Sequence, residues 1–240
     1  MITLLQEDCF IVMEGLENVD LVFADPPYNL GVSMGSKKDS IDDYEDFTYR
    51  WLDEVVRVLK PGGSGYVAFS QDWLWLLLKY VHEKEEINLR STIVWHRQTP
   101  NYGAKTCLAK MWEPIVHFSK GEQETFNLKD VLVPSRQAGR KVDKWMKKAV
   151  GETISAEKNP TDVWEISSAF HSKKEYVGFK GQKPLALLTR IVLLGSNEGD
   201  LVFDPFLGSG TTAVACELLN RNFIGCDIDS VQLAEGRLGL

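Results

Sequence analysis

The stretch "LVFDPFLGSGTT", residues 201–212, joins the end of one predicted strand to the start of a helix. Its apolar first residues can fill a buried strand that ends at Asp204, and Gly208 and Gly210 then allow the backbone to turn tightly. The threonines that follow open a helix, whose N-terminal amides favour a polar or anionic ligand. A strand, a glycine turn and a helix in this order are typical of nucleotide-binding α/β folds.

Strand-like and helix-like segments alternate along most of the chain. This alternation predicts an α/β fold with a doubly wound, mostly parallel sheet that helices cover on both faces. We interpret residues 1–121 and 176–240 as the two halves of one domain, and the less regular residues 122–175 as an insertion. Strands are expected at 2–6, 20–25, 64–70, 89–97, 113–121, 200–206 and 222–229, and helices at 44–60, 71–84, 183–196, 210–220 and from Ser230 onward.

A second strand-like stretch, "LVFADPPYNLG" at 21–31, ends in an unusual corner. Asp25 is followed by Pro26 and Pro27, which cannot extend a sheet, and by the aromatic Tyr28. Ligands of open parallel sheets bind beyond the carboxyl ends of the strands, so this corner and the glycine turn are expected to line one crevice. The carboxylate, the Pro26 carbonyl and the ring suit a flat base that carries an exocyclic amine, because they offer two acceptors and a stacking surface.

Asp227, at the end of the next predicted strand, strengthens the case for a cofactor at the glycine turn. A carboxylate in this place holds ribose hydroxyls in nucleotide-binding βαβ units. The full GxGxxG fingerprint is absent, because "GSGTTA" ends in alanine. An ordinary tight turn between a strand and a helix is the alternative interpretation.

Length and composition restrict the class of protein. The 240 residues, 44% of them apolar, predict one large globular domain or a domain with an insertion. No apolar run is long enough to cross a membrane and the N-terminus does not resemble a signal peptide, so we expect a cytoplasmic protein without a membrane partner. The four cysteines and four histidines are scattered, which predicts neither disulfides nor a metal site.

These residues carry a resemblance to a known family. The chain resembles the β class of S-adenosylmethionine-dependent DNA amino-methyltransferases: "DPPY" at 25–28 is similar to the family's catalytic motif, and "DPFLGSG" at 204–210 to its cofactor motif. "STIVWHR" followed by "WEPIVHFSKG", "GQKPLALLTRI" at 181–191 and "NFIGCDID" at 222–229 resemble further family blocks. The resemblance implies a sheet of the seven-stranded methyltransferase type with an inserted target-recognition segment.

The resemblance also implies a reaction, the transfer of a methyl group from S-adenosylmethionine to the N6 amine of an adenine flipped out of double-stranded DNA. Asp8 has an alternative role as a helix N-cap, and Lys183 as the start of a solvated helix. We expect a side chain at Gly210 to enter the space of the cofactor. The implied catalytic residues are Asp25, Pro26, Pro27 and Tyr28, and the implied cofactor-binding residues are Asp8, Cys9, Asp25, Lys183, Pro184, Asp204, Phe206, Gly208, Gly210, Thr211, Thr212 and Asp227.

The net charge of −7 argues mildly against a nucleic-acid partner, but one segment of the insertion is basic. A solvated helix face is the simple interpretation of such a run. With the resemblance it becomes the DNA-contacting part of the target-recognition segment, whose small core Trp145 and Trp164 are expected to form. The polar residues 29–46 are expected to become ordered on DNA. The predicted DNA-binding residues are Lys129, Arg136, Arg140, Lys141, Lys144, Lys147 and Lys148.

Other functions remain open at this stage. A cytosine-N4 methyltransferase would use the same geometry, although such relatives usually carry serine in place of Asp25. A methyltransferase for protein glutamine or RNA usually has asparagine there, and a DNA-binding protein without catalysis would not need an intact Asp25 or Tyr28. The resemblance is also compatible with a homodimer and with a cognate restriction endonuclease as partners.

Overall fold

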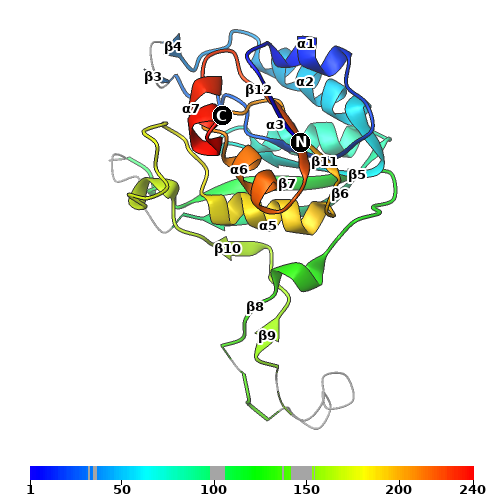
Figure 1. The fold of residues 1–240 in the computed structure, drawn as a ribbon, viewed down its shortest axis with the longest axis vertical. Helices are drawn as coiled ribbons and strands as arrows, with labels where there is room; N and C mark the ends of the chain where they lie inside the picture. The colour runs from blue at the N-terminus through cyan, green and yellow to red at the C-terminus, as the bar shows by residue number, and fades with distance from the viewer. Residues whose placement is uncertain (32, 35–36, 98–105, 137, 142–152, 154) are drawn as a thin grey trace.

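The computed structural model describes residues 1–240 apart from 32, 35–36, 98–105, 137, 142–152 and 154 (Figure 1). The helices are α1 (Cys9–Glu14), α2 (Tyr44–Val58), α3 (Leu74–Glu83), α5 (Leu185–Gly195), α6 (Thr211–Leu218) and α7 (Val231–Leu238), with short 3-10 helices η1 (Leu128–Val131) and η2 (Ala169–His171). The strands are β1 (Ile2–Leu5), β2 (Val19–Ala24), β3 (Ser33–Met34), β4 (Lys37–Lys38), β5 (Leu59–Ala68), β6 (Ile87–His96), β7 (Trp112–Lys120), β8 (Val133–Pro134), β9 (Glu157–Lys158), β10 (Val163–Glu165), β11 (Leu201–Asp204) and β12 (Asn222–Cys226).

The central sheet has the strand order β1-β12-β11-β2-β5-β7-β6-β10. Neighbouring strands are parallel except at β7, which runs antiparallel to both β5 and β6. The predicted α/β class with a mostly parallel sheet is therefore confirmed. The described sheet has eight strands rather than the seven of the predicted type, because β10 adds an edge strand beside β6.

Helices cover both faces of this sheet and divide the core into two clusters (Figure 1). Side chains alternate along β2, so that Val22 and Ala24 face one cluster while Leu21 and Phe23 face the other. The first cluster is closed by apolar residues of α1, α2 and α3, and the second by those of α5, α6 and α7. Such two-sided burial explains why the strands read as nearly continuous apolar runs.

The structure refines several boundaries predicted from the sequence. β5 begins at Leu59 and continues through "PGG" at 61–63, whereas the sequence predicted a helix up to 60 and a strand only from 64. The pairing of β5 with β2 shifts register between Val19 and Leu21. An irregularity in register lets a strand accept residues that a regular ladder excludes. The short helix α1 has no strong periodic signal in the sequence, and only the candidate N-cap Asp8 pointed to it.

The predicted insertion divides into parts that the structure places differently. η1 packs against α5, and β10 pairs with β6, with Trp164 beside Trp95. Trp164 therefore belongs to the core of the main sheet, and the prediction that it forms a separate core with Trp145 is wrong; Trp145 lies outside the described residues. The domain boundaries at 121 and 176 stay a prediction.

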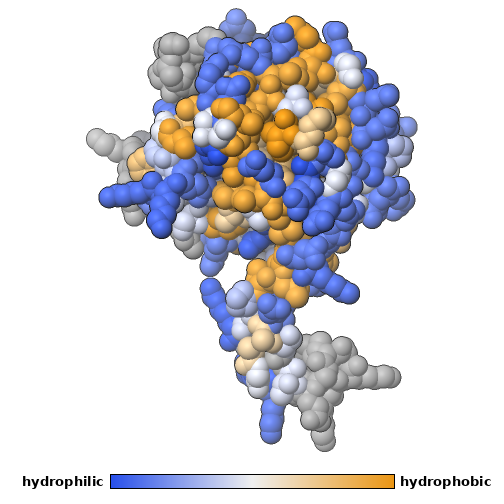
Figure 2. Space-filling view, in the orientation of Figure 1, coloured by the Kyte–Doolittle hydropathy of each residue, from blue (hydrophilic) through white to orange (hydrophobic). Residues whose placement is uncertain are grey.

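The pair β8 and β9 extends away from the rest of the molecule (Figure 1). These strands are antiparallel, and Lys141 forms a further bridge with Thr153. Apolar residues gather on the visible face of the α/β body, whereas the described residues beyond the base of the projecting arm are mostly hydrophilic or neutral (Figure 2). No helix in the described ranges is both long and apolar enough to span a membrane.

Candidate active site

The two motifs found in the sequence meet at one edge of the sheet. β2 and β11 are parallel neighbours, with Leu21 opposite Val202 and Val22 opposite Phe203. The residues that follow them, Asp25 and Pro205, consequently lie at the same edge, at the carboxyl ends of the strands. The two motifs therefore lie side by side at the edge where ligands of such sheets bind, as expected.

Asp25 is held by two donors in this structure. The Tyr28 hydroxyl donates to Asp25 Oδ1 at 2.6 Å, and the Lys183 ammonium donates to Asp25 Oδ2 at 2.5 Å. Lys183 is buried and directly precedes Pro184, the N-cap of α5. Lys183 is thus no solvated helix start, because it points into the site and binds the catalytic candidate.

Burial and charge oppose each other at Lys183 but act in the same direction at Tyr28. Burial alone would lower the pKa of Lys183, but the charges of Asp25 and Glu113 outweigh it and the pKa lies above its ordinary value. Burial raises the pKa of Tyr28 well above its usual range, and the Asp25 carboxylate adds to this rise. Both side chains are therefore protonated donors at neutral pH.

Glu113 is a member of this cluster that the sequence reasoning missed. Its Oε2 lies 3.6 Å from Lys183 Nζ, and its Oε1 accepts a hydrogen bond of 3.0 Å from Arg97 Nη1. β7 is antiparallel to its neighbours, so its beginning lies at the edge where the parallel strands end. A charged residue at the start of a buried strand, within a family block already identified, was the available signal.

Other contacts fix the corner after Asp25. The Tyr44 hydroxyl donates to the Pro27 carbonyl at 2.7 Å, and Asp39 Oδ1 accepts from the Asn29 amide at 2.9 Å. Asn29 has a φ of 52°, a left-handed conformation that asparagine tolerates. Within 29–46 the structure thus shows anchoring contacts, and the ordering of this segment on DNA stays a prediction.

The glycine turn is tied to Asp227. The Gly208 amide donates to Asp227 Oδ2 at 3.0 Å, and Asp227 Oδ1 accepts from the Asp229 and Ser230 amides, both at 2.9 Å. Asp227 therefore joins the turn after β11 to the start of α7. Its carboxylate is only partly buried and keeps acceptor capacity, so contact with a ribose stays a prediction.

Position 210 requires glycine for a reason other than the one predicted. Its φ is 73°, in the left-handed region that favours glycine, and a Cβ placed on it would lie 2.3 Å from the Cβ of Ala234. The expectation that a side chain at Gly210 would enter the cofactor space is therefore wrong. It would collide with α7 instead, so this glycine permits the close approach of α7 to the turn.

Asp204 and the two threonines after the turn are buried. Asp204 accepts from the Phe206 amide at 3.0 Å and from the Thr212 hydroxyl at 2.6 Å, and burial raises the pKa of Asp204 to about 7. The Thr211 hydroxyl donates to the Lys183 carbonyl at 3.0 Å. These bonds join the turn, α6 and the segment before α5, while contacts of these residues with a cofactor stay predictions.

The remaining cofactor candidates lie around the same edge. Asp8 Oδ1 accepts from the Phe10 amide at 2.8 Å, which confirms its alternative role as the N-cap of α1. Burial, followed by the charge of Asp8, raises the pKa of Cys9 to about 12, so this thiol is unreactive. Phe206 packs edge-on against Trp51, with 5.4 Å between ring centroids.

A segment before Lys183 was also missed from the sequence. Phe170 is 66% exposed, Lys173 and Lys174 are exposed, and Phe179 lies against the turn, 3.1 Å from where a Cβ on Gly208 would be. An exposed aromatic ring beside lysines is the kind of surface that binds nucleic acid. The signal, three lysines and four aromatic or histidine residues within 168–180, was visible in the sequence.

The basic cluster is described only in part. Lys129, Arg136, Arg140 and Lys141 are exposed, and Arg136 forms an ion pair of 3.5 Å with Glu165. Exposed basic side chains near the projecting arm agree with a DNA-contacting surface and equally with a solvated one. Lys144, Lys147 and Lys148 lie outside the described residues.

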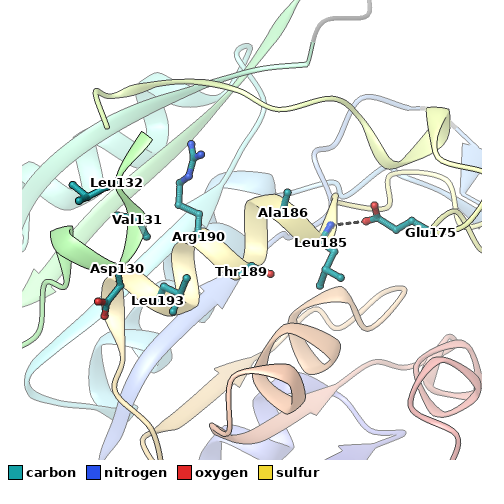
Figure 3. Close-up of a pocket in the computed structure, with 9 residues that line it drawn as sticks. All are labelled: Asp130, Val131, Leu132, Glu175, Leu185, Ala186, Thr189, Arg190 and Leu193. Carbon is teal, nitrogen blue, oxygen red and sulfur yellow. Dashed lines mark hydrogen bonds between the residues drawn. The ribbon is translucent and has the colours of Figure 1, made fainter. Parts of the chain in front are cut away.

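A shallow cleft of about 540 Å³ lies along α5 (Figure 3). Arg190 reaches the Trp164 ring at 5.1 Å, and Glu175 accepts a hydrogen bond from the Leu185 amide at the start of α5. The cleft holds none of the residues predicted to act on a base or a cofactor. Its lining consists of Asp130, Val131, Leu132, Glu175, Leu185, Ala186, Thr189, Arg190 and Leu193.

In the described part of the chain, no three His, Cys, Asp or Glu side chains are grouped as metal ligands would be. The site offers the carboxylate of Asp25, its two donors and the fixed turn. A carboxylate at a rigid corner, next to a glycine turn at the neighbouring strand end, can hold an amine close to a bound cofactor.

Known proteins match this chain over most of its length. A family model described as DNA methylase matches residues 19–235. The type II methyltransferase M.HpaI of Haemophilus parainfluenzae is 35% identical over 240 residues, which cover 96% of this chain and 73% of that protein. The DNA adenine methyltransferase YhdJ of Escherichia coli K12 is 34% identical over 225 residues, covering 92% and 75%.

Solved structures share the fold. The M1.HpyAVI complex with SAM has a TM-score of 0.72 at 22% identity and covers both chains completely. The cytosine-N4-specific PvuII DNA methyltransferase has a TM-score of 0.74 at 18% identity, over 98% of this chain and 86% of that one. The family match and the relatives above 30% identity confirm the family predicted from the sequence: the chain belongs to the DNA methylase family and is a DNA methyltransferase.

Proposed function

We propose that this DNA methyltransferase transfers a methyl group from S-adenosylmethionine to the N6 amine of a specific adenine in double-stranded DNA. The observation that carries the proposal is the position of Asp25 at the end of β2, beside the glycine turn that follows β11. YhdJ, which is named a DNA adenine methyltransferase, covers most of this chain. S-adenosylmethionine is the cofactor in the M1.HpyAVI complex, which has the same fold.

The chemistry explains the choice of residues. The lone pair of an exocyclic amine is delocalised into the ring, so the amine is a poor nucleophile until acceptors localise that pair. Asp25 and the Pro26 carbonyl are suited to accept its two N–H groups and to stabilise the positive charge that develops on the nitrogen. Tyr28 has to release Asp25 in order to stack on the flipped base, which replaces stacking lost from the duplex.

The residues around the glycine turn fit S-adenosylmethionine. Asp227 keeps free acceptor capacity for ribose hydroxyls, and Asp8, which is exposed, for the adenine amine. Phe206, half buried against Trp51, offers an apolar wall. When bound, the cofactor supplies an electrophilic methyl group; the chain's part is to orient the amine toward it and to exclude water.

The exposed basic residues of the projecting arm and the segment around Phe170 are proposed to contact DNA. Phosphate binding by Lys141 and Lys173 would position the duplex while the protein reads the bases elsewhere. A homodimer and a cognate restriction endonuclease are compatible with the type II relatives and remain proposals for this chain. We also propose a cytoplasmic location, because the substrate is DNA.

The variant Asp25→Ala tests the proposal. Incorporation of labelled methyl groups into DNA should fall to background, while calorimetry still detects S-adenosylmethionine binding. Asp162→Ala is the matched control. Asp162 is exposed and lies just before β10, at the amino ends of the parallel strands, whereas Asp25 lies at their carboxyl ends. Nucleoside analysis should find N6-methyladenine; N4-methylcytosine would instead support the second family reaction, and substantial turnover by Asp25→Ala would refute the role of Asp25.

A further inference from the structure

The ammonium group of Lys183 lies between two carboxylates and satisfies only one of them. It is 2.5 Å from Asp25 Oδ2 and 3.6 Å from Glu113 Oε2, so the second distance is too long for a hydrogen bond. Glu113 Oε2 is buried and has no hydrogen-bond partner in the described structure. Because buried acceptors are normally paired, this oxygen is prepared for a donor that the present arrangement does not supply.

The present position of Lys183 conflicts with the proposed reaction. The Asp25 carboxylate is occupied on Oδ2 by the ammonium and on Oδ1 by the Tyr28 hydroxyl. An amine that attacks a methyl sulfonium becomes positively charged, and a second cation on the same carboxylate would oppose that charge. The ammonium has to leave Asp25 before this carboxylate can serve the target amine fully.

We propose that Lys183 has two positions, and that Glu113 is the positioning residue that receives its ammonium when the target amine binds Asp25. This inference rests on the proposed function of Asp25. A displacement of about 1 Å brings Nζ within hydrogen-bond distance of Glu113 Oε2, a small movement for a lysine side chain. Arg97 holds the other oxygen of Glu113 at 3.0 Å and so keeps the receiving carboxylate in place.

The charges of the cluster support a shift of the ammonium rather than the loss of its proton. Two carboxylates, Asp25 and Glu113, face two cations, Lys183 and Arg97. Moving the ammonium between the carboxylates leaves the total charge of the buried cluster unchanged. The raised pKa of Lys183, to which both carboxylates contribute, agrees with an ammonium that stays charged in either position.

A structure of the complex with DNA and a non-reactive analogue of S-adenosylmethionine tests the two positions directly. The positions that the enzyme methylates in DNA are mapped first, and a duplex that contains this site is then used. We expect Lys183 Nζ within about 3.2 Å of Glu113 Oε2 and the target amine on Asp25. An ammonium that stays on Asp25 Oδ2 while the flipped amine is bound would overturn the inference, even if Asp25 acts as proposed.

Kinetics provide a second, independent measurement. Glu113→Gln should lower the single-turnover rate roughly 10- to 100-fold, the range for losing a hydrogen bond to a charged group, with little change in the affinity for S-adenosylmethionine. In a Lys183→Met background the same substitution should have almost no further effect, because Glu113 acts through Lys183. Equal losses in both backgrounds would assign Glu113 a merely structural role.

Controls separate this inference from the proposed function. Glu124→Gln is the matched variant, since Glu124 is exposed and pairs with Lys60 far from Asp25; its rate should equal that of the wild type. Glu113→Asp keeps the charge and should recover part of the rate lost in Glu113→Gln. If Asp25→Ala is inactive and Glu113→Gln is fully active, only the two-position inference fails; an active Asp25→Ala variant removes the basis of both.

Discussion

Replacing Asp204 by asparagine should stabilise the protein at neutral and alkaline pH. Asp204 is buried at the end of β11, where burial raises the pKa of its carboxyl to about 7 from an ordinary 3.8. Asparagine has nearly the same shape. Its oxygen can accept from the Phe206 amide, and its NH₂ group can donate to the Thr212 hydroxyl, so both hydrogen bonds of Asp204 have a replacement.

The magnitude follows from the difference between the two pKa values of Asp204. Between pH 3.8 and about 7 the folded protein holds a proton that the unfolded chain releases, so stability falls as the pH rises through this window. The full difference corresponds to about 4 kcal/mol, reached above pH 7. From about pH 5 to about pH 8 the expected part is about 3 kcal/mol.

Denaturant unfolding at a series of pH values measures this effect. The stability of Asp204→Asn minus that of the wild type should grow by about 3 kcal/mol between about pH 5 and pH 8 and then stay level. Glu122→Gln, at a side chain 99% exposed, should show no such trend. A difference between Asp204→Asn and wild type that is constant from pH 5 to pH 8 would refute a protonated Asp204 in the fold.

Three further substitutions test other parts of the structure. Tyr44→Phe removes the hydrogen bond to the Pro27 carbonyl and should lower stability by about 1 kcal/mol and the methylation rate more strongly, measured by unfolding and single-turnover assays. Gly210→Val should destabilise the fold by several kcal/mol in thermal unfolding, because its side chain would meet Ala234. Lys141→Ala should flatten the slope of log affinity for DNA against log salt by about one, without changing the methylated site.

For each of these three substitutions, one outcome would contradict the prediction. If the fall in methylation rate of Tyr44→Phe, expressed as a free energy, is no larger than its loss of stability, the hydrogen bond to the Pro27 carbonyl does not position the corner at Asp25. A folded Gly210→Val variant with wild-type stability would show that α7 can move away from the turn. An unchanged salt slope in Lys141→Ala would leave this lysine as part of a solvated face.

The sequence predicted the class of fold because the signals are local. Apolar runs of strand length, amphipathic helices and the glycine turn each depend on neighbouring residues, and their alternation permits few arrangements of a sheet. The two motifs at Asp25 and Asp204 were also readable, since each begins at the carboxyl end of a buried strand. Their position at one edge of the sheet followed from the general rule that ligands bind at the carboxyl ends of parallel strands.

Several predictions about single side chains depended on information that the sequence does not hold. Gly210 was expected to leave room for a ligand, but its Cβ direction points at α7. Trp164 was expected in a separate small core and instead lies in the core of the main sheet. The direction in which a side chain points and the residues that it contacts are set by the backbone geometry and by residues that are distant in sequence. Local sequence patterns contain neither kind of information.

The amino-acid sequence by itself determined the α/β class, the family, the corner at Asp25 that we propose to be catalytic, and the turn after β11, since each is written in consecutive residues. Only the tertiary structure decided that Lys183, 158 positions away, and Glu113 from the antiparallel β7 meet at Asp25. The physical reason is that sheet topology brings strand ends together irrespective of their separation in the chain. Whether a buried charge has a partner is then settled by packing, which no periodic pattern encodes.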